Sequence, residues 1–508
     1  MAKAKVFLVG AGPGDPGLIT VRGKECIETA EVIIYDYLAA PALLIHAQKK
    51  AEIIYVGKKG GDHTLSQGQI NALIVEKAKA GFRVCRLKGG DPFIFGRGGE
   101  EAEVLVAKGI PFEVVPGVTA AVAAAAYAGI PLTHRKLTAT LAFITGHEDP
   151  HKEESSIDWD SLSRGIGTLV FFMGVKNLPD ITQKLIAHGK SPDTPVALIR
   201  WGTTPAQQTV SGTLDDIAER VKAAGLKAPA IIVVGEVVRL RKTLKWYENR
   251  PLLGKRIVVT RAREQASDLV RRLAELGAEC LEFPTIEVVP AEDSDPLENA
   301  INNLSAYDWI VFTSVNGVKY FFDRLFESGR DVRALHQLQT AAIGPVTSEK
   351  LHSFGLKSDI IPQNYRAEAV VEAFRKMDLK GKKILLPRAA EARPVLPIEL
   401  RKMGAEVTEV TAYLTRQVGD NAAPLIEQLT EKRIDLITFT SSSTVKNFKA
   451  LLPADNFQGL TEGVTVASIG PITTDTAKAL GFNVQITAEA YTIQGLCDAI
   501  LNYYRNIE

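Results

Sequence analysis

Glycine-rich turns, with a few charged side chains near them, are the residues of this sequence that could carry chemistry. The first turn, Gly10-Ala-Gly-Pro-Gly-Asp15, follows a short apolar run and is similar in outline to turns that bind dinucleotide phosphates. Its spacing differs, because Asp15 stands where the third glycine of G-x-G-x-x-G belongs. Pro13 also lacks the backbone N–H that a phosphate-binding helix N-terminus would use. This turn alone leaves open a nicotinamide oxidoreductase and other nucleotide-binding enzymes.

Longer motifs follow in a fixed order and are more specific than the first turn. The second is Leu87-Lys-Gly-Gly-Asp-Pro-Phe-Ile-Phe-Gly-Arg-Gly-Gly-Glu-Glu101, and four loops come after it: Val115-Pro-Gly-Val-Thr-Ala120, Gly129-Ile-Pro-Leu-Thr-His-Arg135, Phe172-Met-Gly174 and Gly202-Thr-Thr-Pro205. With these loops the sequence resembles the uroporphyrinogen-III C-methyltransferase family over residues 3–245. The resemblance implies a two-subdomain α/β fold of the tetrapyrrole methyltransferase type. It also implies that S-adenosylmethionine binds between the subdomains and leaves as S-adenosylhomocysteine.

The residues at the family's donor-binding positions have side chains that suit this ligand. Carried over position by position, they are Pro13, Gly89, Gly90, Asp91, Ile94, Thr119, Ala120, Met173 and Gly202. A glycine pair lets backbone groups approach the amino-acid end of the donor, and Asp91 can pair with its ammonium group or ribose hydroxyls. Ile94 and Met173 can contact the adenine. Each residue alone is equally typical of a turn or a core, so the assignment depends on the ordered set of loops.

Methyl transfer to a pyrrole carbon requires positioning and the removal of one proton, and no covalent nucleophile. The resemblance implies that Asp36 and Lys58 act as an acid/base pair; a solvated loop is the alternative for Lys58. Arg97 and Arg135 suit the propionate and acetate groups of the substrate, because guanidinium forks match carboxylates. Arg97, with Glu100 close by, is also a catalytic candidate for proton removal. That role ranks below substrate binding, because a guanidinium rarely loses a proton.

The second half of the sequence contains an internal repeat. Phe312-Thr-Ser314 returns as Phe439-Thr-Ser441 after 127 residues (441 − 314), and Ala342-Ile-Gly-Pro-Val346 returns as Ser468-Ile-Gly-Pro-Ile472 after 126 (470 − 344, between the glycines). Each copy has the pattern of strand, helix and strand, which predicts two similar α/β lobes with equivalent loops. Two copies are too few for a solenoid.

Small hydroxyl residues recur where the strands of both copies are expected to end. The candidates for substrate binding are Thr313, Ser314, Thr440, Ser441 and Thr473. Their ordinary role is in turns and helix N-caps. The functional alternative is that hydroxyl and backbone N–H groups of both lobes bind carboxylates across a cleft.

This half resembles uroporphyrinogen-III synthase over residues 254–508, on the motifs Ile257-Val-Val-Thr-Arg261, Ile310-Val-Phe-Thr-Ser314, Ala342-Ile-Gly-Pro345, Ile469-Gly-Pro-Ile-Thr473 and Tyr413. The resemblance implies a two-lobed α/β synthase domain whose chain crosses between lobes twice. Lobe one would comprise about residues 254–285 with 416–508, and lobe two about 288–412. The sequence repeat need not coincide with these lobes.

The synthase resemblance also implies a reaction that needs no cofactor. Hydroxymethylbilane would lose water, invert its last pyrrole ring and close to uroporphyrinogen III. Tyr413 matches the family's cleft tyrosine and is the candidate donor to the leaving hydroxyl, since a phenol remains a donor at neutral pH. An ordinary strand tyrosine is the alternative for Tyr413. A non-catalytic two-lobed module, such as a periplasmic-type binding protein, is the alternative for the whole half.

Short apolar runs alternate with helical patterns and place the motifs of the first half at strand ends. The expected strands are Val6–Val9, Val32–Tyr35, Ile53–Val56, Val84–Leu87, Leu141–Thr145, Thr168–Phe172, Pro195–Ile199 and Ile231–Val234, and one expected helix is Gln67–Ala80. This alternation predicts α/β layers. The Ala-rich run Val118–Leu132 predicts a buried helix. A basic, aromatic stretch over Arg239–Gly254 predicts a boundary, with a methyltransferase domain over 1–245, a linker or brace over 246–253 and the synthase after it.

Composition excludes several classes of function. The 508 residues carry a formal net charge of +1, which provides no global field for nucleic acid or an anionic membrane. The four cysteines lie far apart and form no C-x-x-C pair, as is usual for reduced thiols. No signal-peptide core or membrane-length apolar run is seen, so we expect a cytoplasmic protein. His147, Glu148, Asp149 and His151 resemble a metal cluster, but they surround Pro150 in a polar loop, so we predict no metal site.

Together the two resemblances predict a bifunctional enzyme whose second half makes the substrate of its first. Methylation of uroporphyrinogen III at C2 and C7 would give precorrin-2, for siroheme or cobalamin. No dehydrogenase/chelatase domain is seen before Val6, so the product is expected to stop at precorrin-2. Methyltransferases of this kind are usually dimeric, so a homodimer through the first half is expected.

Overall fold

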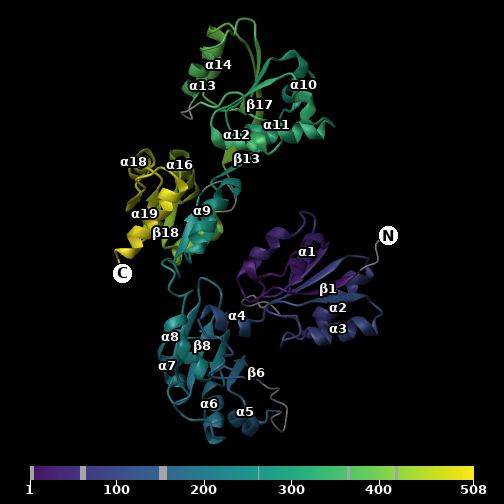
Figure 1. The fold of residues 1–508 in the computed structure, drawn as a ribbon, viewed down its shortest axis with the longest axis vertical. Coiled ribbons are helices and arrows are strands. Elements are labelled where there is room, and N and C mark those ends of the chain that lie inside the picture. Colours follow the sequence, from purple (N-terminus) through teal and green to yellow (C-terminus); the bar gives the residue numbers. More distant parts are fainter. Residues whose placement is uncertain are drawn as a thin grey trace. The chain divides into compact units, whose positions relative to one another are not determined.

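The computed structural model describes residues 5–57, 65–147, 157–260, 263–362, 367–417 and 422–507, which contain four five-stranded sheets (Figure 1). The chain divides into two compact units. Unit 1 comprises Met1–Lys255 with Leu273–Glu279 and Glu508, and unit 2 comprises Arg256–Arg272 with Cys280–Ile507. Each unit contains two sheets, and the predicted α/β class is confirmed. No helix among the described residues has both the length and the apolar character that a membrane span needs.

The first sheet of unit 1 is parallel throughout, with the order β3-β2-β4-β1-β5. Its strands are β1 (Val6–Gly10), β2 (Val32–Tyr35), β3 (Glu52–Tyr55), β4 (Val84–Lys88) and β5 (Phe112–Val115), joined through η1 (Pro16–Leu18), α1 (Val21–Thr29), η2 (Pro41–His46), α2 (Gln67–Lys79) and α3 (Gly98–Ala107). Alternate residues of β1 belong to two different hydrophobic core clusters. Phe7 and Val9 belong to one cluster, and Val6 and Leu8 belong to the other. Both faces of the sheet are therefore covered.

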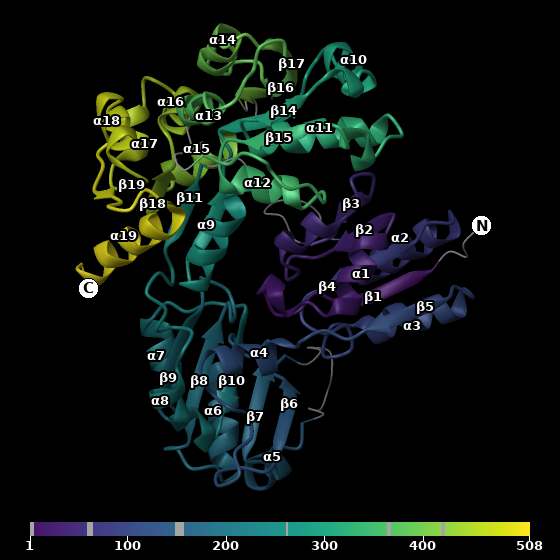
Figure 2. The same cartoon turned by 45° about the horizontal axis from the view of Figure 1, so that its top comes forward.

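The second sheet of unit 1 is mixed, with the order β6-β7-β10-β8-β9 (Figure 2). Its strands are β6 (Leu141–Thr145), β7 (Thr168–Phe172), β8 (Pro195–Arg200), β9 (Gln208–Thr213) and β10 (Ala230–Val234). On one face it packs against α4 (Ala120–Tyr127), and on the other against α5 (Trp159–Gly165), α6 (Leu178–Ala187) and α7 (Ile217–Ala223). Two short helices, η3 (Glu236–Leu240) and α8 (Arg241–Leu244), follow β10.

The eight strands predicted for this half are confirmed to within one residue at each end, and the predicted helix ends at Lys79 instead of Ala80. The Ala-rich run forms a buried helix as predicted, but only over its middle. α4 ends at Tyr127 because Gly129 adopts φ +74° and Pro131 follows.

Unit 2 also has two sheets. The lobe-one sheet, in the order β12-β11-β18-β19-β20, contains β11 (Arg256–Val259), β12 (Glu279–Glu282), β18 (Leu436–Phe439), β19 (Thr465–Ser468) and β20 (Ile486–Thr487). The lobe-two sheet, in the order β13-β17-β16-β14-β15, contains β13 (Ile286–Pro290), β14 (Trp309–Phe312), β15 (Gln339–Ala342), β16 (Lys383–Ala389) and β17 (Glu406–Gln417). β13 and β17, which pair antiparallel, carry the chain into and out of lobe two (Figure 1).

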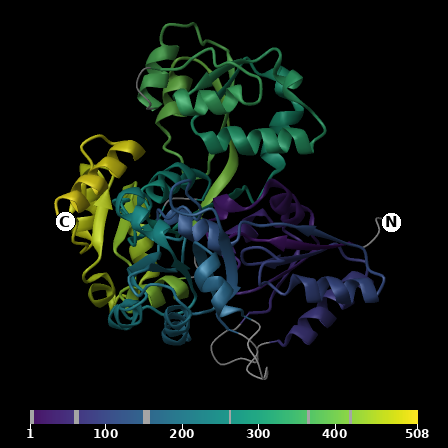
Figure 3. The same cartoon turned by 60° about the horizontal axis from the view of Figure 1, so that its bottom comes forward.

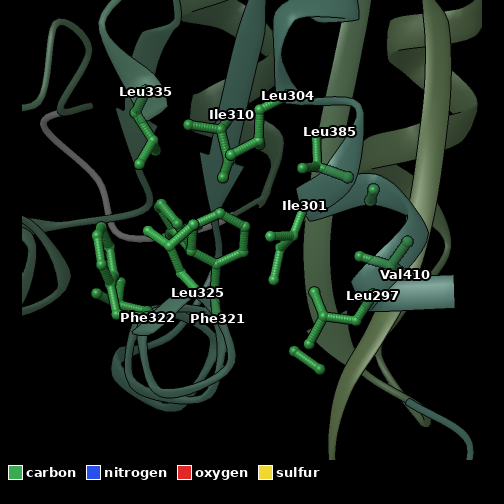
Figure 4. Close-up of a cluster of buried hydrophobic side chains, with 14 of the residues drawn as sticks. Leu297, Ile301, Leu304, Ile310, Phe321, Phe322, Leu325, Leu335, Leu385 and Val410 are labelled. Carbon is green, nitrogen blue, oxygen red and sulfur yellow. The ribbon is translucent and has the colours of Figure 1, made fainter. Parts of the chain in front are cut away.

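Helices accompany both sheets of unit 2. Those of lobe one are α9 (Arg263–Glu275), α15 (Ala423–Thr430), α16 (Ser442–Leu451), α17 (Phe457–Thr461), α18 (Pro471–Ala479) and α19 (Ile493–Arg505). Those of lobe two, green in Figure 3, are α10 (Asp295–Asn302), η4 (Leu304–Ala306), α11 (Val315–Glu327), η5 (Val332–Leu335), α12 (Pro345–His352), α13 (Ala367–Phe374) and α14 (Val395–Lys402). Ile310 and Phe312 of β14 face the cluster drawn in Figure 4, whereas Trp309 and Val311 face the opposite one.

The sequence repeat does not coincide with these lobes. β14 and β18 are equivalent in the two copies (436 − 309 = 127), and so are β11 and β16 (383 − 256 = 127). Yet β11 pairs with β18, and β14 pairs with β16. β11 and β14 belong to the first copy of the repeat, and β16 and β18 belong to the second. Each sheet therefore contains strands from both copies.

Candidate active sites

Three glycine loops meet at one edge of the first sheet of unit 1. β1, β4 and β5 are adjacent and parallel, so their carboxyl ends lie together. Gly90 N donates to Gly12 O at 2.7 Å, which joins the first two loops. A Cβ on Gly117 would lie 2.2 Å from Gly90 O, and one on Gly10 would lie 2.5 Å from the Gly117 Cα. Only glycine allows these loops to approach so closely.

Asp91 ties the second loop to the third. Its Oδ1 accepts a hydrogen bond from Phe93 N at 2.8 Å, and its Oδ2 accepts one from Gly117 N at 3.0 Å. Thr119 is the N-cap of α4 and makes no side-chain capping bond. A side chain on Gly90 would point toward Thr119 and Ala120, with the Ala120 N 3.7 Å from its Cβ. The structure thus brings five predicted donor residues together: Gly89, Gly90, Asp91, Thr119 and Ala120.

A turn after β8 closes over the first glycine loop, in which Pro13 lies. A Cβ on Gly202 would lie 2.2 Å from the Ala124 Cβ of α4. Asp15 N donates to Thr203 Oγ1 at 3.0 Å, and the Trp201 ring lies 5.7 Å from that of Tyr37. Gly202 therefore contacts α4, and its neighbour Thr203 holds the turn to the first loop.

A cavity of about 580 Å³ opens beside the second glycine loop. Its lining includes Phe93, Phe95, Arg97, Glu100 and Met173, and the Phe95 ring packs 5.0 Å from that of Phe172 at the end of β7. Of the predicted site residues, Arg97, Glu100 and Met173 line this cavity; Ile94 and the exposed Arg135 do not.

Unusual backbone conformations cluster in these loops. Six non-glycine residues in the described part of the chain have a positive φ, and five of them are Phe95, Arg97, Met173, Trp201 and Thr203. Such strain persists only where the surrounding structure imposes it, and it is common at functional sites.

Arg97 already has a carboxylate partner. Its Nε and Nη2 donate to the two carboxylate oxygens of Glu100 at 2.8 and 2.7 Å. These hydrogen bonds raise the pKa of Arg97 and hold the pKa of Glu100 below its ordinary value. A carboxylate of a substrate would therefore have to share Arg97 with Glu100 or displace it.

Asp36 belongs to a partly buried charge network. Its Oδ2 accepts from Arg86 Nη2 at 2.9 Å, and its Oδ1 accepts from Leu38 N at 3.2 Å. Arg86 also donates to Glu101 Oε1, which accepts from Lys88 Nζ at 2.7 Å. Burial, and to a lesser extent the charge of Arg86, lower the pKa of Lys88. Lys58, the proposed partner of Asp36, lies outside the described residues.

No group of three or more potential metal ligands is found among the described residues. His147 is one of them, whereas Glu148, Asp149 and His151 of the suspected cluster lie outside the described ranges.

In unit 2 the structure pairs two residues that were predicted separately. Ser314 caps α11 by accepting from Gly317 N, and its hydroxyl lies 2.9 Å from that of Tyr413. Tyr413 is 8% exposed, and its ring stacks on Tyr320 at 5.8 Å. Thr313 is half-buried beside Ser314 at the end of β14.

In lobe one Ser441 caps α16 and lies 2.9 Å from the Ser443 hydroxyl. Thr440 is half-buried beside it, but Thr473 is only 5% exposed in the first turn of α18. The equivalent strand ends of the two lobes thus carry equivalent serine caps, Ser314 and Ser441, at helix N-termini that suit anions.

Comparison with known proteins agrees with this division. A family model described as Tetrapyrrole (Corrin/Porphyrin) Methylases matches residues 5–218, and one described as Uroporphyrinogen-III synthase HemD matches residues 267–498. The porphyrin biosynthesis protein HemD of Ruminiclostridium josui is 38% identical over 496 residues, which are 98% of this chain and 97% of that protein. The chain belongs to this HemD family.

This HemD-family enzyme joins a uroporphyrinogen-III C-methyltransferase domain to a uroporphyrinogen-III synthase domain, so both resemblances seen in the sequence are confirmed. The uroporphyrinogen-III C-methyltransferase of Bacillus subtilis is 44% identical over 67% of this chain and 70% of its own length. The S-adenosyl-L-methionine-dependent uroporphyrinogen III methyltransferase of Methanosarcina barkeri is 56% identical over 47% of this chain and 94% of its own length.

Sequence reasoning missed the charge network of this HemD-family enzyme. The available signal was Arg86 and Lys88 at alternate positions of the otherwise apolar strand β4, because two cations buried on one face of a strand require a buried anion. That anion is Glu101, which belongs to the second motif but was given no role. Sequence reasoning also missed a row of hydrogen-bonded hydroxyl groups in lobe one, in which Thr474 bonds to both Ser468 and Thr487.

Proposed function

We propose that the enzyme converts hydroxymethylbilane to uroporphyrinogen III and then methylates that product at C2 and C7 with S-adenosylmethionine, giving precorrin-2. The observation that carries the methyltransferase part is the convergence of the Gly10, Gly90 and Gly117 loops with the Gly202 turn, beside the cavity lined by Arg97. We assign methylation to residues 1–245, a linking role to 246–253 and cyclisation to 254–508.

The residues of the proposed donor site suit S-adenosylmethionine in type. Gly90 has φ +67°, a conformation that favours glycine, and the second glycine loop lies against the start of α4, where a Cβ on Gly90 would contact Ala120 N at 3.7 Å. The residues of the proposed site are Pro13, Gly89, Gly90, Asp91, Ile94, Thr119, Ala120, Met173 and Gly202. When bound, S-adenosylmethionine supplies a methyl group made electrophilic by its sulfonium centre.

The residues of the chain orient the tetrapyrrole and accept its proton. Arg97 and Arg135 bind side-chain carboxylates of uroporphyrinogen III, and Glu100 competes for Arg97 until the substrate displaces it. Asp36, held by Arg86 and Leu38 N, accepts the proton that the methylated pyrrole carbon loses, with Lys58 as its acid partner. Phe93 and Phe95 provide apolar surface for the pyrrole rings in the same cavity.

In the synthase half Tyr413 donates a proton to the hydroxyl that leaves hydroxymethylbilane. Ser314 orients the phenol through the 2.9 Å contact. Thr313, Thr440, Ser441 and Thr473, with the backbone N–H groups at the starts of α11 and α16, bind the carboxylates of the linear tetrapyrrole.

The test is incubation of the full chain with hydroxymethylbilane and S-adenosylmethionine. We expect a dimethylated tetrapyrrole of the type III ring order. Accumulation of uroporphyrinogen III without any methylated product would disprove the methyltransferase proposal, and formation of the type I isomer alone would disprove the synthase proposal. Omission of S-adenosylmethionine is the control, and replacement of it by NAD tests the oxidoreductase alternative.

The same proposal covers the pathway, the cellular compartment and the oligomeric state of the enzyme. It supplies precorrin-2 for siroheme or cobalamin in the cytoplasm, as a homodimer formed through the methyltransferase half. Sedimentation equilibrium of the full chain tests the dimer, and a monomeric mass at micromolar concentration would contradict it.

A further inference from the structure

Residues 241–250, which follow the last strand of unit 1, pack against the carboxyl end of α4. We call this segment the strap. Trp246 Nε1 donates to Ala126 O at 3.0 Å, and Arg241 Nη1 donates to Ala128 O at 2.6 Å. A Cβ on Gly129 would lie 2.5 Å from the Leu244 backbone. The strap is therefore part of the methyltransferase core, although the sequence predicted a linker or brace over its second half, residues 246–250.

Aromatic residues connect the strap to the first glycine loop. The ring of Tyr127 of α4 contacts those of Trp246 and Tyr247, with centroids 5.0 and 4.8 Å away, and those two rings also contact each other. The Tyr127 hydroxyl donates to Asp15 Oδ2 at 2.8 Å. Burial and the hydrogen bond to Asp15 raise the pKa of Tyr127, so its hydroxyl stays protonated as a donor. Tyr247 OH donates to Thr203 O at 3.2 Å in the turn that contains Gly202.

Glu248 completes a second connection to the same turn. Its Oε1 accepts from Gln207 Nε2 at 2.8 Å and from Thr209 Oγ1, and its Oε2 pairs with Arg241. Gln207 in turn accepts a hydrogen bond from Thr203 N at 2.8 Å through its Oε1. Because Glu248 binds the amide nitrogen of Gln207, it directs the amide oxygen of that residue toward Thr203.

The hydrogen bonds with Gln207 and Tyr247 hold Thr203 in an unfavourable backbone conformation. Thr203 is 2% exposed, and its φ of +72° is a conformation that a β-branched residue rarely adopts. Its N–H, its carbonyl and its hydroxyl are all engaged, by Gln207, Tyr247 and Asp15 N respectively. The strap accounts for the carbonyl contact directly and for the N–H contact through Gln207.

We propose that the strap is part of the methyl-donor site, with Glu248 as the positioning residue that holds the turn of Gly202 against the donor. The proposal rests on the proposed function, in which Gly202 contacts S-adenosylmethionine. Loss of the Glu248 carboxylate would leave Arg241 as an unpaired, mostly buried cation and would free the Gln207 amide to rotate. The turn could then relax from its left-handed conformation and move away from the donor.

The test is calorimetric titration of the full chain with S-adenosylmethionine. For Glu248→Ala we expect the Kd to rise about tenfold, which corresponds to the loss of about 1.4 kcal/mol of hydrogen bonding. Glu248→Gln keeps an acceptor oxygen for Gln207 and Thr209 but turns its amide NH2 group toward Arg241, so its Kd should lie between those of Glu248→Ala and the unmodified chain. Glu236→Ala, which removes only the exposed pair with Arg239, is the matched control.

Steady-state kinetics separate positioning from general damage. In Glu248→Ala the KM for S-adenosylmethionine should rise, while the KM for uroporphyrinogen III, the kcat at saturating donor and the synthase turnover stay unchanged. An equal rise in both KM values would overturn the proposal. If Glu248→Ala does not fold, Tyr247→Phe removes only the hydroxyl donor to Thr203 and should raise the Kd about threefold.

The outcomes also distinguish this inference from the proposed function. Absence of S-adenosylmethionine binding by the unmodified chain would disprove the proposed function. Normal binding by the unmodified chain and equally tight binding by Glu248→Ala would disprove only the role of the strap.

Discussion

The hydroxyl oxygens of Ser314 and Tyr413 lie 2.9 Å apart, although 99 residues separate the two in sequence. Ser314 comes two residues after the end of β14 and caps α11, whereas Tyr413 lies on β17, on the other side of β16 in the same sheet. Gly317 N donates to Ser314 Oγ at 2.9 Å and so restricts where the serine hydroxyl can point. Two residues predicted for different roles, substrate binding and proton donation, are therefore one hydrogen-bonded unit.

Replacement of this phenol tests the unit directly. Tyr413→Phe should lower synthase turnover about 100-fold, because it removes the acid that assists departure of the hydroxyl. Methylation of added uroporphyrinogen III should not change. The measurement is the rate of type III product formation from hydroxymethylbilane, with the isomers separated. Tyr320→Phe, in the stacked neighbouring ring, is the matched control; equal rates in the two variants would remove Tyr413 from the mechanism.

Gly202→Ala should abolish tight binding of S-adenosylmethionine. The new Cβ would lie 2.2 Å from that of Ala124, so the turn must move away from α4 at a cost of about 1–3 kcal/mol. We expect a rise in Kd of about 10-fold or more, measured by titration of the full chain. Gly165→Ala, where a Cβ meets nothing within 4 Å, is the control. Unchanged affinity in Gly202→Ala would place the donor elsewhere.

Arg97→Lys should raise the KM for uroporphyrinogen III about tenfold, because an ammonium group cannot bind a carboxylate through the two-pronged geometry of a guanidinium. Glu100→Gln should lower the same KM, since it removes the carboxylate that now occupies Arg97 at 2.7 and 2.8 Å. Initial rates at saturating S-adenosylmethionine measure both effects. Arg164→Lys, in the exposed pair with Asp160, is the control. Changes of the same sign in both variants would contradict this reading of the pair.

Glu101→Gln should destabilise the methyltransferase half by about 3–5 kcal/mol, because it leaves Arg86 and Lys88 buried without their shared anion. Scanning calorimetry of the full chain measures the effect, with added S-adenosylmethionine identifying the transition of this half. Glu76→Gln on the exposed side of α2 is the control. A transition within about 1 °C of that of the unmodified chain would show that the two cations find other partners.

Much of the methyltransferase half follows from local sequence. Its strands are continuous apolar runs whose alternate residues face two buried layers, so Val6–Gly10 and Thr168–Phe172 can be read from side-chain type alone. The glycines at positions 10, 90 and 117 are recognisable from their motifs: there is no room for a Cβ at positions 10 and 117, and position 90 has a φ of +67°. These features depend on one residue and its immediate neighbours, which a sequence displays directly.

The pairing of charges and hydroxyls was decided by the tertiary structure. Glu101 serves Arg86 and Lys88 only because α3 packs on β4, and Glu248 reaches Gln207 across 41 residues of chain. The repeat could likewise be found in the sequence, but the exchange of β11 and β16 between its copies could not. Hydrogen bonds and strand pairs form between whichever groups the packed layers bring together, and a single sequence records the groups without recording their neighbours.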